Sequence, residues 1–526
     1  MQTSDTIIYG ESMANSGESE RAPFLEKTYA VTADDNTATD YSRNQIQFNT
    51  SGANSSRWAD YKNAYMVFPT TTVMSRSAYN EAAADGANGI HWKSGPVLID
   101  SVQIEYNNSS IVQQRRDVTA WASFIQHTTM SENDRLVKGP SVGYFKPSSE
   151  WDYEDERGLV SGDSLPASAI DSEFARNTGL GKAELMADTT IKNSGADTYV
   201  YIAPVPEVPG VGGGAATPAV PAKHVYYKNV MIRLRDILNL FENLPLIKGG
   251  AMTITLTFNQ AKMVTTYTAG VVSAVAPTLQ GLAFPVLRVN PTGLAGHDLV
   301  ETIQVAVGRI AGYDQPADNQ CRLHVPTYTL APEAELALLS KGVQKVKFDD
   351  LNIVSLKNNE PGREFSLLVS NSQTRMKRII VVPTLSASGN GAMQQLPCTS
   401  QFCSEPATPS PCFIRNMNVL LGGSPVYTKN IRYKYETFLD EVEAKFGVQA
   451  GRDTGLSSSL ISLSDYESNY GYFVCDLTRR FDIDRDEPVN VRITGTIESA
   501  KNLDFLVYIE FEKEISFDLS TGAVVD

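Results

Sequence analysis

The chain contains an internal repeat. Residues 66–70 read MVFPT and residues 380–384 read IVVPT, at an offset of 314. Residues 96–106 (PVLIDSVQIEY) resemble residues 411–421 (PCFIRNMNVLL) at an offset of 315. Both copies of the second block run into a polar turn, and a helical pattern follows in each. Any two β strands resemble each other, but the conserved order and spacing favour a duplicated fold.

The repeat predicts two similarly folded units. We expect the first to cover residues 1–285, with a polar N-terminal arm of about thirty residues and a long insertion loop at 131–224. The second then covers residues 286–526. A Pro/Gly-rich stretch at 204–222 predicts a surface excursion that proteases cut first, because loop backbone needs water or partners for its polar groups.

The repeat also makes a prediction about register. Met66–Thr70 is expected to superpose on Ile380–Thr384, and Val97–Tyr106 on Cys412–Leu421, with Ile414 buried in the second core. A slip of one residue would turn every side chain of a strand to the opposite face.

Strand signals dominate the rest of the chain. Residues 251–259 alternate apolar residues with threonine, and residues 503–511 repeat the same period of two. Helical spacing is confined to residues 435–446, residues 234–244 and a segment around Trp121. Many strands with few helices indicate an all-β chain of sandwiches or barrels.

Composition limits the possible partners. The 526 residues are 42% hydrophobic and 20% charged, which is typical of a globular protein. A formal net charge of −15 is unsuited to neutralising phosphates, so we expect no direct sequence-specific nucleic-acid binding. We see no signal peptide and no stretch of 18 apolar residues, and we expect a soluble protein. Whether a membrane is a partner stays open.

The cysteines and histidines form no site signature. The five cysteines lack paired CxxC motifs, and we interpret them as free thiols in a reducing compartment. The five histidines are scattered, with no HExxH motif, and we interpret them as structural. These residues are Cys321, Cys398, Cys403, Cys412, Cys475, His91, His127, His224, His297 and His324.

No catalytic motif is present in the sequence. GxSxG, Walker A and Rossmann patterns are absent, and GVGGGA at 210–215 lacks the preceding strand that a phosphate loop requires. The acidic run at 151–157 could supply two carboxylates for hydrolysis, but we interpret it as a solvated loop. We therefore predict no catalytic residue, no cofactor-binding residue and no cofactor.

One acidic cluster resembles the start of a calcium loop. Asp482, Asp484 and Asp486 stand at alternate positions, but Glu487 occupies the place of the required glycine and Ile493 that of the final glutamate. We therefore predict that folding and assembly need no metal.

Several segments resemble the double jelly-roll major capsid proteins, hexon-like proteins of the polinton, adintovirus and virophage group. The likeness is one of pattern and order, and it is stronger in the second half. It is carried by CRLHVPTYTL (321–330), SLLVSNSQTRMKRIIVVPTL (366–385), NIRYKYETFLDEV (430–442), GYFVCDLTRRFDI (471–483) and LVYIEFEKEISFDLSTG (506–522).

The resemblance implies two tandem eight-stranded jelly rolls with a few short helices in loops, and a structural, non-enzymatic protein of the virion. Three chains would form a pseudo-hexameric capsomer, and capsomers would tile an icosahedral shell that encloses a DNA genome. The implied partners are further copies of the chain, penton proteins and minor capsid proteins, with synthesis and assembly inside the host cell.

Two alternatives remain open at this point. A viral spike or receptor-binding protein would form a trimer or fibre without a shell lattice. An all-β carbohydrate-active enzyme would carry two carboxylates in a groove lined by tryptophan, but only four tryptophans occur, at positions 58, 92, 121 and 151.

Overall fold

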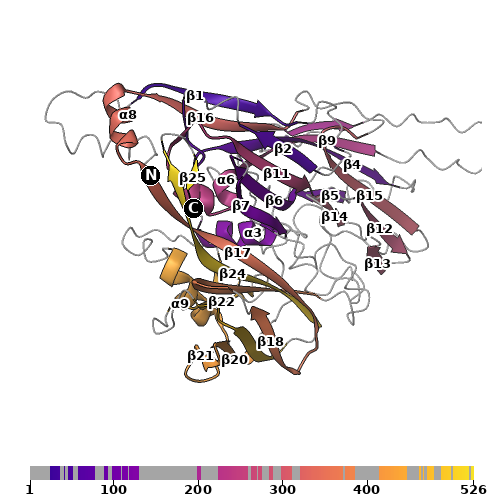
Figure 1. Cartoon of the computed structure of the whole chain (residues 1–526). Helices are drawn as coiled ribbons and strands as arrows, with labels where there is room; N and C mark the ends of the chain where they lie inside the picture. Colours follow the sequence, from indigo (N-terminus) through magenta and orange to yellow (C-terminus); the bar gives the residue numbers. More distant parts are fainter. Residues whose placement is uncertain are drawn as a thin grey trace, which may run out of the picture.

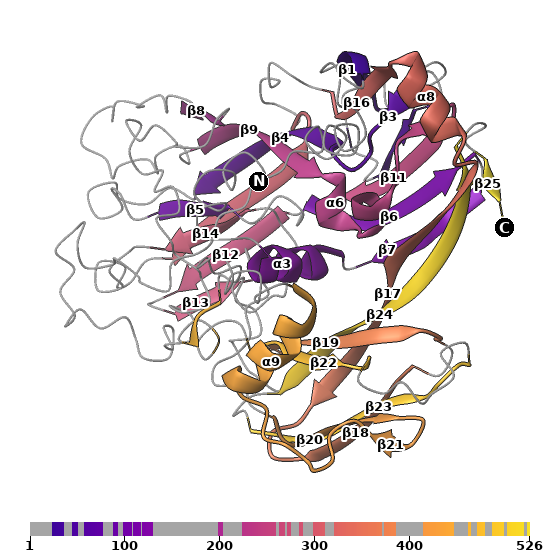
Figure 2. The same cartoon turned by 90° about the vertical axis from the view of Figure 1, so that its left-hand side faces the viewer.

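A computed structural model shows an elongated molecule made of stacked β-sheets (Figures 1 and 2). The structure describes residues 24–35, 41, 45–50, 57–76, 88–92, 98–107, 109–116, 118–129, 198–202, 223–258, 262–268, 271–274, 283–287, 298–310, 320–370, 373–385, 414–446, 461–463, 466, 471–478, 487–498, 502–519 and 523–525. The first stretch already belongs to β1 (Phe24–Ala33), so the polar arm expected for the first thirty residues ends in a strand.

The first unit is a sandwich of two antiparallel sheets. The strands of one sheet follow the order β1, β16 (Arg322–Leu330), β4 (Tyr65–Arg76) and β9 (Lys223–Arg233). The strands of the other follow the order β2 (Gln45–Asn49), β11 (Met252–Phe258), β6 (Ile99–Tyr106) and β7 (Ser109–Arg116).

Further strands extend the first of these sheets. They are β3 (Trp58–Ala59), β8 (Thr198–Ile202), β10 (Ile247–Lys248), β12 (Lys262–Thr268), β13 (Val271–Ala274) and β15 (Asp298–Val307). A separate pair is formed by β5 (Asn88–Trp92) and β14 (Ala283–Leu287).

The second unit is a smaller sandwich. One sheet has the order β17 (Val343–Asn359), β24 (Leu503–Asp518), β19 (Met376–Leu385) and β22 (Phe473–Asp476), and β25 (Val524–Val525) pairs with β24. The other has the order β18 (Glu364–Ser370), β23 (Val491–Ile497), β20 (Ile414–Leu421) and β21 (Ser424–Pro425).

The two units have the same topology. When the eight sandwich strands of each unit are counted 1 to 8 along the chain, both units have one sheet of order 1-8-3-6 and one of order 2-7-4-5. This arrangement of paired antiparallel sheets is the jelly roll. The expectation of an all-β double jelly roll is confirmed. The repeated segments occupy strand 3 (β4 and β19) and strand 4 (β6 and β20) of each unit, which are equivalent strands.

The register of the strand-4 repeat agrees with the predicted offset of 315. Ile99 and Ile104 of β6 are buried, and so are Ile414 and Val419 at the matching positions of β20. Gly495 of the adjacent strand β23 leaves the space that Ile414 fills, since an added Cβ would lie 2.5 Å from the Ile414 side chain. The predicted burial of Ile414 is confirmed.

The register of the strand-3 repeat differs, as the packing of β4 shows first. The ring centroid of Phe68 lies 6.5 Å from that of Phe48 and 5.4 Å from that of Phe258, both in the opposite sheet. Phe68, and Met66 two positions earlier, therefore face the core between the sheets.

In β19 the core-facing positions are shifted by one residue. Pro383 pairs with Phe505, whose ring lies 5.6 Å from Phe365 in the opposite sheet, so Pro383 and Val381 face the core. The predicted offset of 314 is therefore wrong by one, because it matches core-facing residues of β4 with Ile380 and its outward-facing neighbours. An offset of 315 restores the faces, and the shared proline of the two blocks is not structurally equivalent.

The chain passes from the first sandwich to the second later than expected. β15 and β16 follow residue 285, yet both pair with β4 in the first unit. A boundary at 285/286 divides this sheet, and the passage from one sandwich to the other lies between Leu330 and Val343. Helix α8 (Pro332–Leu339), which we did not expect, occupies this connection and begins with the proline that favours a first helical turn.

The remaining helices agree with the helical spacing in the sequence. They are α3 (Val118–Thr129), α6 (Leu234–Ile237), α7 (Leu240–Asn243) and α9 (Tyr435–Phe446). The segment 234–244 forms two short helices rather than one. Both α3 and α9 lie between strands 5 and 6 of their units, so the helix is part of the repeat.

The long strands β17 and β24 contribute to both cores. Val507 and Ile509 lie in the core of the second unit, whereas Ile515 and Phe517 lie in the core of the first. These alternate positions belong to one face of one strand. The ring of Phe517 lies 5.4 Å from that of Tyr106 in β6. The ribbon therefore joins the sandwiches through shared apolar burial, as its path between them in Figure 2 shows.

Candidate assembly site at the junction of the jelly rolls

Helix α3 forms one part of the junction between the two units. Trp121 and Phe124 of this first-unit helix are buried in the core cluster of the second unit. The Trp121 ring lies 6.2 Å from Tyr508 of β24, and the Phe124 ring lies 5.0 Å from Tyr472. The helix therefore covers the outer face of the second unit's 1-8-3-6 sheet, the face that points away from its own sandwich.

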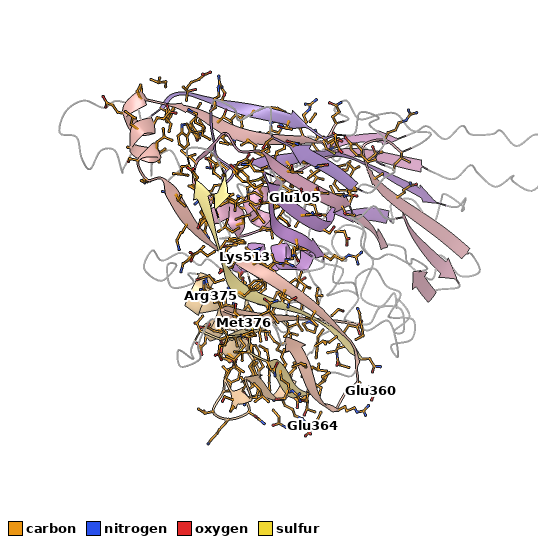
Figure 3. The ribbon with its side chains drawn as sticks, in the orientation of Figure 1. Glu105, Glu360, Glu364, Arg375, Met376 and Lys513 are labelled. Atoms are coloured by element: carbon orange, nitrogen blue, oxygen red, sulfur yellow. The ribbon has the colours of Figure 1, made fainter. Side chains whose placement is uncertain are left out.

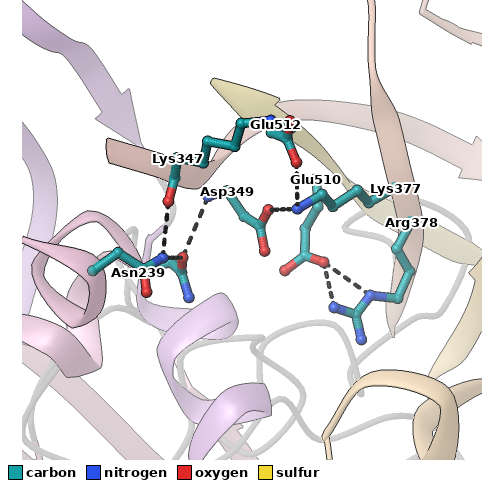
Figure 4. A network of polar contacts seen from close by, with 8 residues as sticks. Asn239, Lys347, Asp349, Lys377, Arg378, Glu510 and Glu512 are labelled. Carbon is teal, nitrogen blue, oxygen red and sulfur yellow. Dashed lines mark hydrogen bonds and ion pairs between the residues drawn. The ribbon is translucent and has the colours of Figure 1, made fainter. Parts of the chain in front are cut away.

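Burial of this outer face explains an exception to the strand pattern. Glu510 alternates with core residues in β24, yet it is only 1% exposed and forms an ion pair with Arg378 of β19, which is 2% exposed. Its carboxylate accepts hydrogen bonds from Nε, at 2.9 Å, and from Nη2 of the guanidinium (Figure 4). A buried charge is tolerated only when it is paired in this way.

A second buried carboxylate marks the crossing between the two cores. Asp350 of β17 receives two hydrogen bonds from Arg115 of β7, at 3.2 Å from Nε and 2.8 Å from Nη2. Lys513 of β24 donates to the backbone oxygen of Ile111 at 2.6 Å. Lys513 and Arg375 lie between the two sandwiches in Figure 3, whereas Glu360 and Glu364 lie at the far end of the second unit. The polar groups thus tie β17 and β24 to β7 of the first unit.

A line of charged residues lies on the face of β17 and β24 opposite to Asp350 and Lys513. Lys377 contacts Asp349 at 2.6 Å and Glu512 at 3.2 Å, and Lys347 contacts Glu512 at 3.3 Å. Burial alone would lower the pKa of Lys377, but hydrogen bonds and attraction from Asp349 and Glu512 raise it. Burial would likewise raise the pKa of Glu512, and its two lysine partners more than offset this and lower it.

The free edge of β17 is covered by the first unit. Asn239, beside α7, accepts a hydrogen bond from the backbone N–H of Asp349 at 3.3 Å, and Asn243 donates to the backbone oxygen of Lys347 at 3.1 Å. Exposed strand edges invite pairing with other chains, and these side-chain amides satisfy two backbone groups of the edge, at Lys347 and Asp349 (Figure 4).

Two cysteines and one histidine of the predicted set have described side chains. Cys321 and Cys475 are buried and form no disulfide, and burial raises the pKa of the Cys321 thiol, so it is a poor nucleophile. His324 stacks on Tyr65, with ring centroids 4.8 Å apart. The side chains of His91, His127 and His224 and the whole of His297, Cys398, Cys403 and Cys412 lie outside the described residues.

Other predicted segments also lie outside the described residues. These are 151–157, 204–222 with its GVGGGA run, and the cluster Asp482, Asp484 and Asp486. Within the described parts of the chain, no three His, Cys, Asp or Glu side chains gather in a way that could hold a metal ion. Among the described helices, none is long and apolar enough to cross a bilayer.

No protein-family model matches the chain. No curated protein sequence matches it either.

Solved structures of similar shape do exist. A chain in the structure of the Sputnik virophage has a TM-score of 0.52 and 12% identity, over 97% of this chain and 90% of that one. The mavirus major capsid protein has a TM-score of 0.48 and 10% identity, over 98% and 92%. The Faustovirus major capsid protein has a TM-score of 0.46 and 10% identity, over 95% and 92%. The strand order and the similarity to the Sputnik chain together show that the chain has the double jelly-roll fold.

Proposed function

We propose that the chain is the major capsid protein of an icosahedral DNA virus, with a structural and non-catalytic role in the virion. Three copies form a pseudo-hexameric capsomer, and capsomers tile the shell around the genome. The observation that carries this proposal is the junction. Two sandwiches of identical topology are held in one fixed relation by the buried side chains of α3, a shared ribbon and the Arg115–Asp350 ion pair.

Fixed relative geometry is what a ring of repeated units requires. Two equivalent units in each chain give six positions when three chains close a ring, and closed symmetry is usual for oligomers. Partners would be neighbouring capsomers, penton proteins and minor capsid proteins. Paired sheets with few exposed edges also suit a shell that must not aggregate irregularly.

The carbohydrate-enzyme alternative finds no support in the described tryptophans. Trp58 and Trp121 are both buried in apolar clusters instead of lining a groove. A sugar-binding cleft needs aromatic faces that a ligand can reach.

Electron microscopy and mass photometry of the purified full chain test the proposal. We expect a species of about three times 57.4 kDa, and hexagonal capsomers or closed shells at high concentration. A stable single-copy species under near-physiological salt would overturn the trimer. Trimers that assemble only into fibres would favour the spike alternative.

A further inference from the structure

Exposed apolar side chains gather at the end of the molecule where β1 begins. Leu25 in β1 is 70% exposed and Leu336 in α8 is 69% exposed, more than any other large apolar side chain of the described residues. Val343, at the start of β17, is 51% exposed. Figures 1 and 2 show α8 beside β1 at this end. We call Leu25, Leu336 and Val343 the end patch, because exposed apolar side chains that gather in one place mark an interaction site.

A small apolar cluster holds the elements of the end patch together. It joins β1, β3, α8, β16 and the residue after β24. The backbone N–H of Leu519 donates to the oxygen of Gly342 at 3.3 Å, directly before Val343. The three patch residues therefore stand on elements that meet at one cluster. The buried members of the cluster are Trp58, Tyr328, Leu330 and Leu519, and Phe24, Ala334, Leu338 and Leu339 pack against them.

Helix α8 is also held in place by polar contacts. Glu335 accepts hydrogen bonds from the indole N–H of Trp58, at 3.4 Å, and from the ammonium group of Lys248. The side of the helix that carries Leu338 packs against the cluster, and this leaves Leu336 on the side that faces away. The end patch is therefore a preformed surface, which lowers the cost of binding a partner.

The chain enters the fold at this same end. Residues 1–23 lie outside the described residues, and they join the described chain at Phe24, next to Leu25 of the end patch. Their sequence is mostly polar and contains one run of three large apolar residues, Ile7, Ile8 and Tyr9. Such a run gains free energy by covering apolar surface, at roughly 25 cal/mol for each Å² removed from water.

The length of the connection allows this contact within one chain. Residues 10–24, fifteen in number, separate the apolar run from Leu25. At about 3.3 Å per extended residue they span up to roughly 50 Å. Helix α8 has eight residues, so it is only about 12 Å long at 1.5 Å per residue. A short tether also gives an effective concentration on the order of millimolar, which favours the chain's own segment over that of another copy.

We infer that residues 7–9 dock on the end patch of their own chain and cover Leu25, Leu336 and Val343. The contact shields the apolar end of the molecule from lipid and from other copies. It lies within one chain, so it is the same in a single copy and in a trimer and does not depend on the proposed assembly.

A photo-crosslinker in place of Ile8, in the full chain, tests the contact. We expect crosslinks to peptides within residues 332–343, which include α8 and the start of β17. In a mixture of isotopically light and heavy chains, these crosslinks should join light to light and heavy to heavy. Mixed light–heavy crosslinks would assign the patch to the segment of another copy and would overturn the inference, as would the absence of crosslinks to residues 332–343.

A substitution in the end patch provides a matched comparison. Leu336→Glu should lower the yield of the Ile8 crosslink at least about tenfold, because a carboxylate opposes burial under an apolar segment. Leu463→Glu is the control, since Leu463 is 49% exposed in the second unit, and its crosslink yield should stay unchanged. Both side chains are exposed, so neither substitution should shift the melting temperature. Equal yields in the two variants would overturn the inference.

Flotation with vesicles of phosphatidylcholine and phosphatidylglycerol tests lipid as the occupant instead. The wild-type chain should stay unbound, because its own segment covers the end patch. Ile7→Ser/Ile8→Ser removes the apolar run and should not lower the melting temperature. Vesicle binding by the wild-type chain that Leu336→Glu abolishes and Leu463→Glu preserves would show that lipid occupies the patch and would overturn the inference.

Discussion

The two jelly rolls share one strand order but differ in what covers their sheets. The second unit has the outer face of its 1-8-3-6 sheet buried by α3, and it places a buried ion pair there. The first unit exposes the same face at Tyr29 and Val31. One topology is therefore compatible with a face whose apolar residues are buried by a neighbouring helix or one whose apolar residues are exposed.

The difference shows that duplication did not leave two independent domains. Trp121 of the first unit is buried in the core of the second, and Phe517 of the second unit is buried in the core of the first. Each sandwich is completed by a side chain from the other. The units should therefore lose stability together, although each has its own pair of sheets.

A charge placed in the second core should disrupt the chain most. Ile414→Asp should block folding, because an unpaired buried carboxylate costs several kcal/mol beyond the lost apolar contacts. The yield of soluble protein and its circular dichroism report the result. Arg415→Ser, at the exposed neighbouring position, should fold normally. A folded Ile414→Asp protein would contradict the prediction that Ile414, the equivalent of Ile99, is a core position.

The exchange of side chains predicts a reciprocal pattern. Trp121→Ala and Phe517→Ala should each destabilise the chain by about 4 kcal/mol, the usual cost of removing a buried aromatic ring. Hydrogen exchange should rise in β24 and β19 for Trp121→Ala, although Trp121 belongs to the first unit. It should rise in β6 for Phe517→Ala. Exchange confined to the mutated residue's own unit would contradict the shared cores.

The buried ion pair tests the covered face directly. Glu510→Gln leaves the Arg378 guanidinium buried beside a neutral amide, and this should cost about 3 kcal/mol in denaturant unfolding. Glu360→Gln is the control, since its pair with Arg363 lies on the exposed surface and contributes less than about 1 kcal/mol. Equal effects from the two substitutions would show that the junction is open to water.

The ion pairs of Glu512 should make a small contribution that depends on pH. The pKa of Glu512 is lowered in the folded chain, so its contribution is present above the ordinary value of 4.5 and is lost as pH falls below it. Glu512→Gln should therefore remove part of the fall in the free energy of unfolding between pH 5 and pH 3 (roughly the range in which carboxylates of this kind titrate), by less than about 1 kcal/mol in denaturant unfolding. Glu364→Gln, on the exposed surface of β18, serves as the comparison. An unchanged pH profile in Glu512→Gln would show that the ion pairs of Glu512 with Lys347 and Lys377 do not stabilise the fold.

Local pattern predicted much of this fold. The alternation at 251–259 became β11, and the helical spacing at 435–446 became α9 with the same bounds. The repeat identified strands 3 and 4 of both units because order and spacing survive where individual residues change. The predicted strand-3 register was wrong because it aligned the proline that both blocks share. The correct register is set by which side chains face the core, and this depends on packing against the opposite sheet.

The fold class, the duplication and the lack of known catalytic motifs can be read from the residues alone, since each follows from periodicity and spacing along the chain. The end of the first sandwich, the covered face of each sheet and the burial of Glu510 became visible only in three dimensions. These depend on contacts between residues more than a hundred positions apart, such as Glu510 with Arg378 and Arg115 with Asp350. No local pattern encodes such contacts, because a carboxylate in an alternating strand has the same spacing whether water or a second jelly roll covers it.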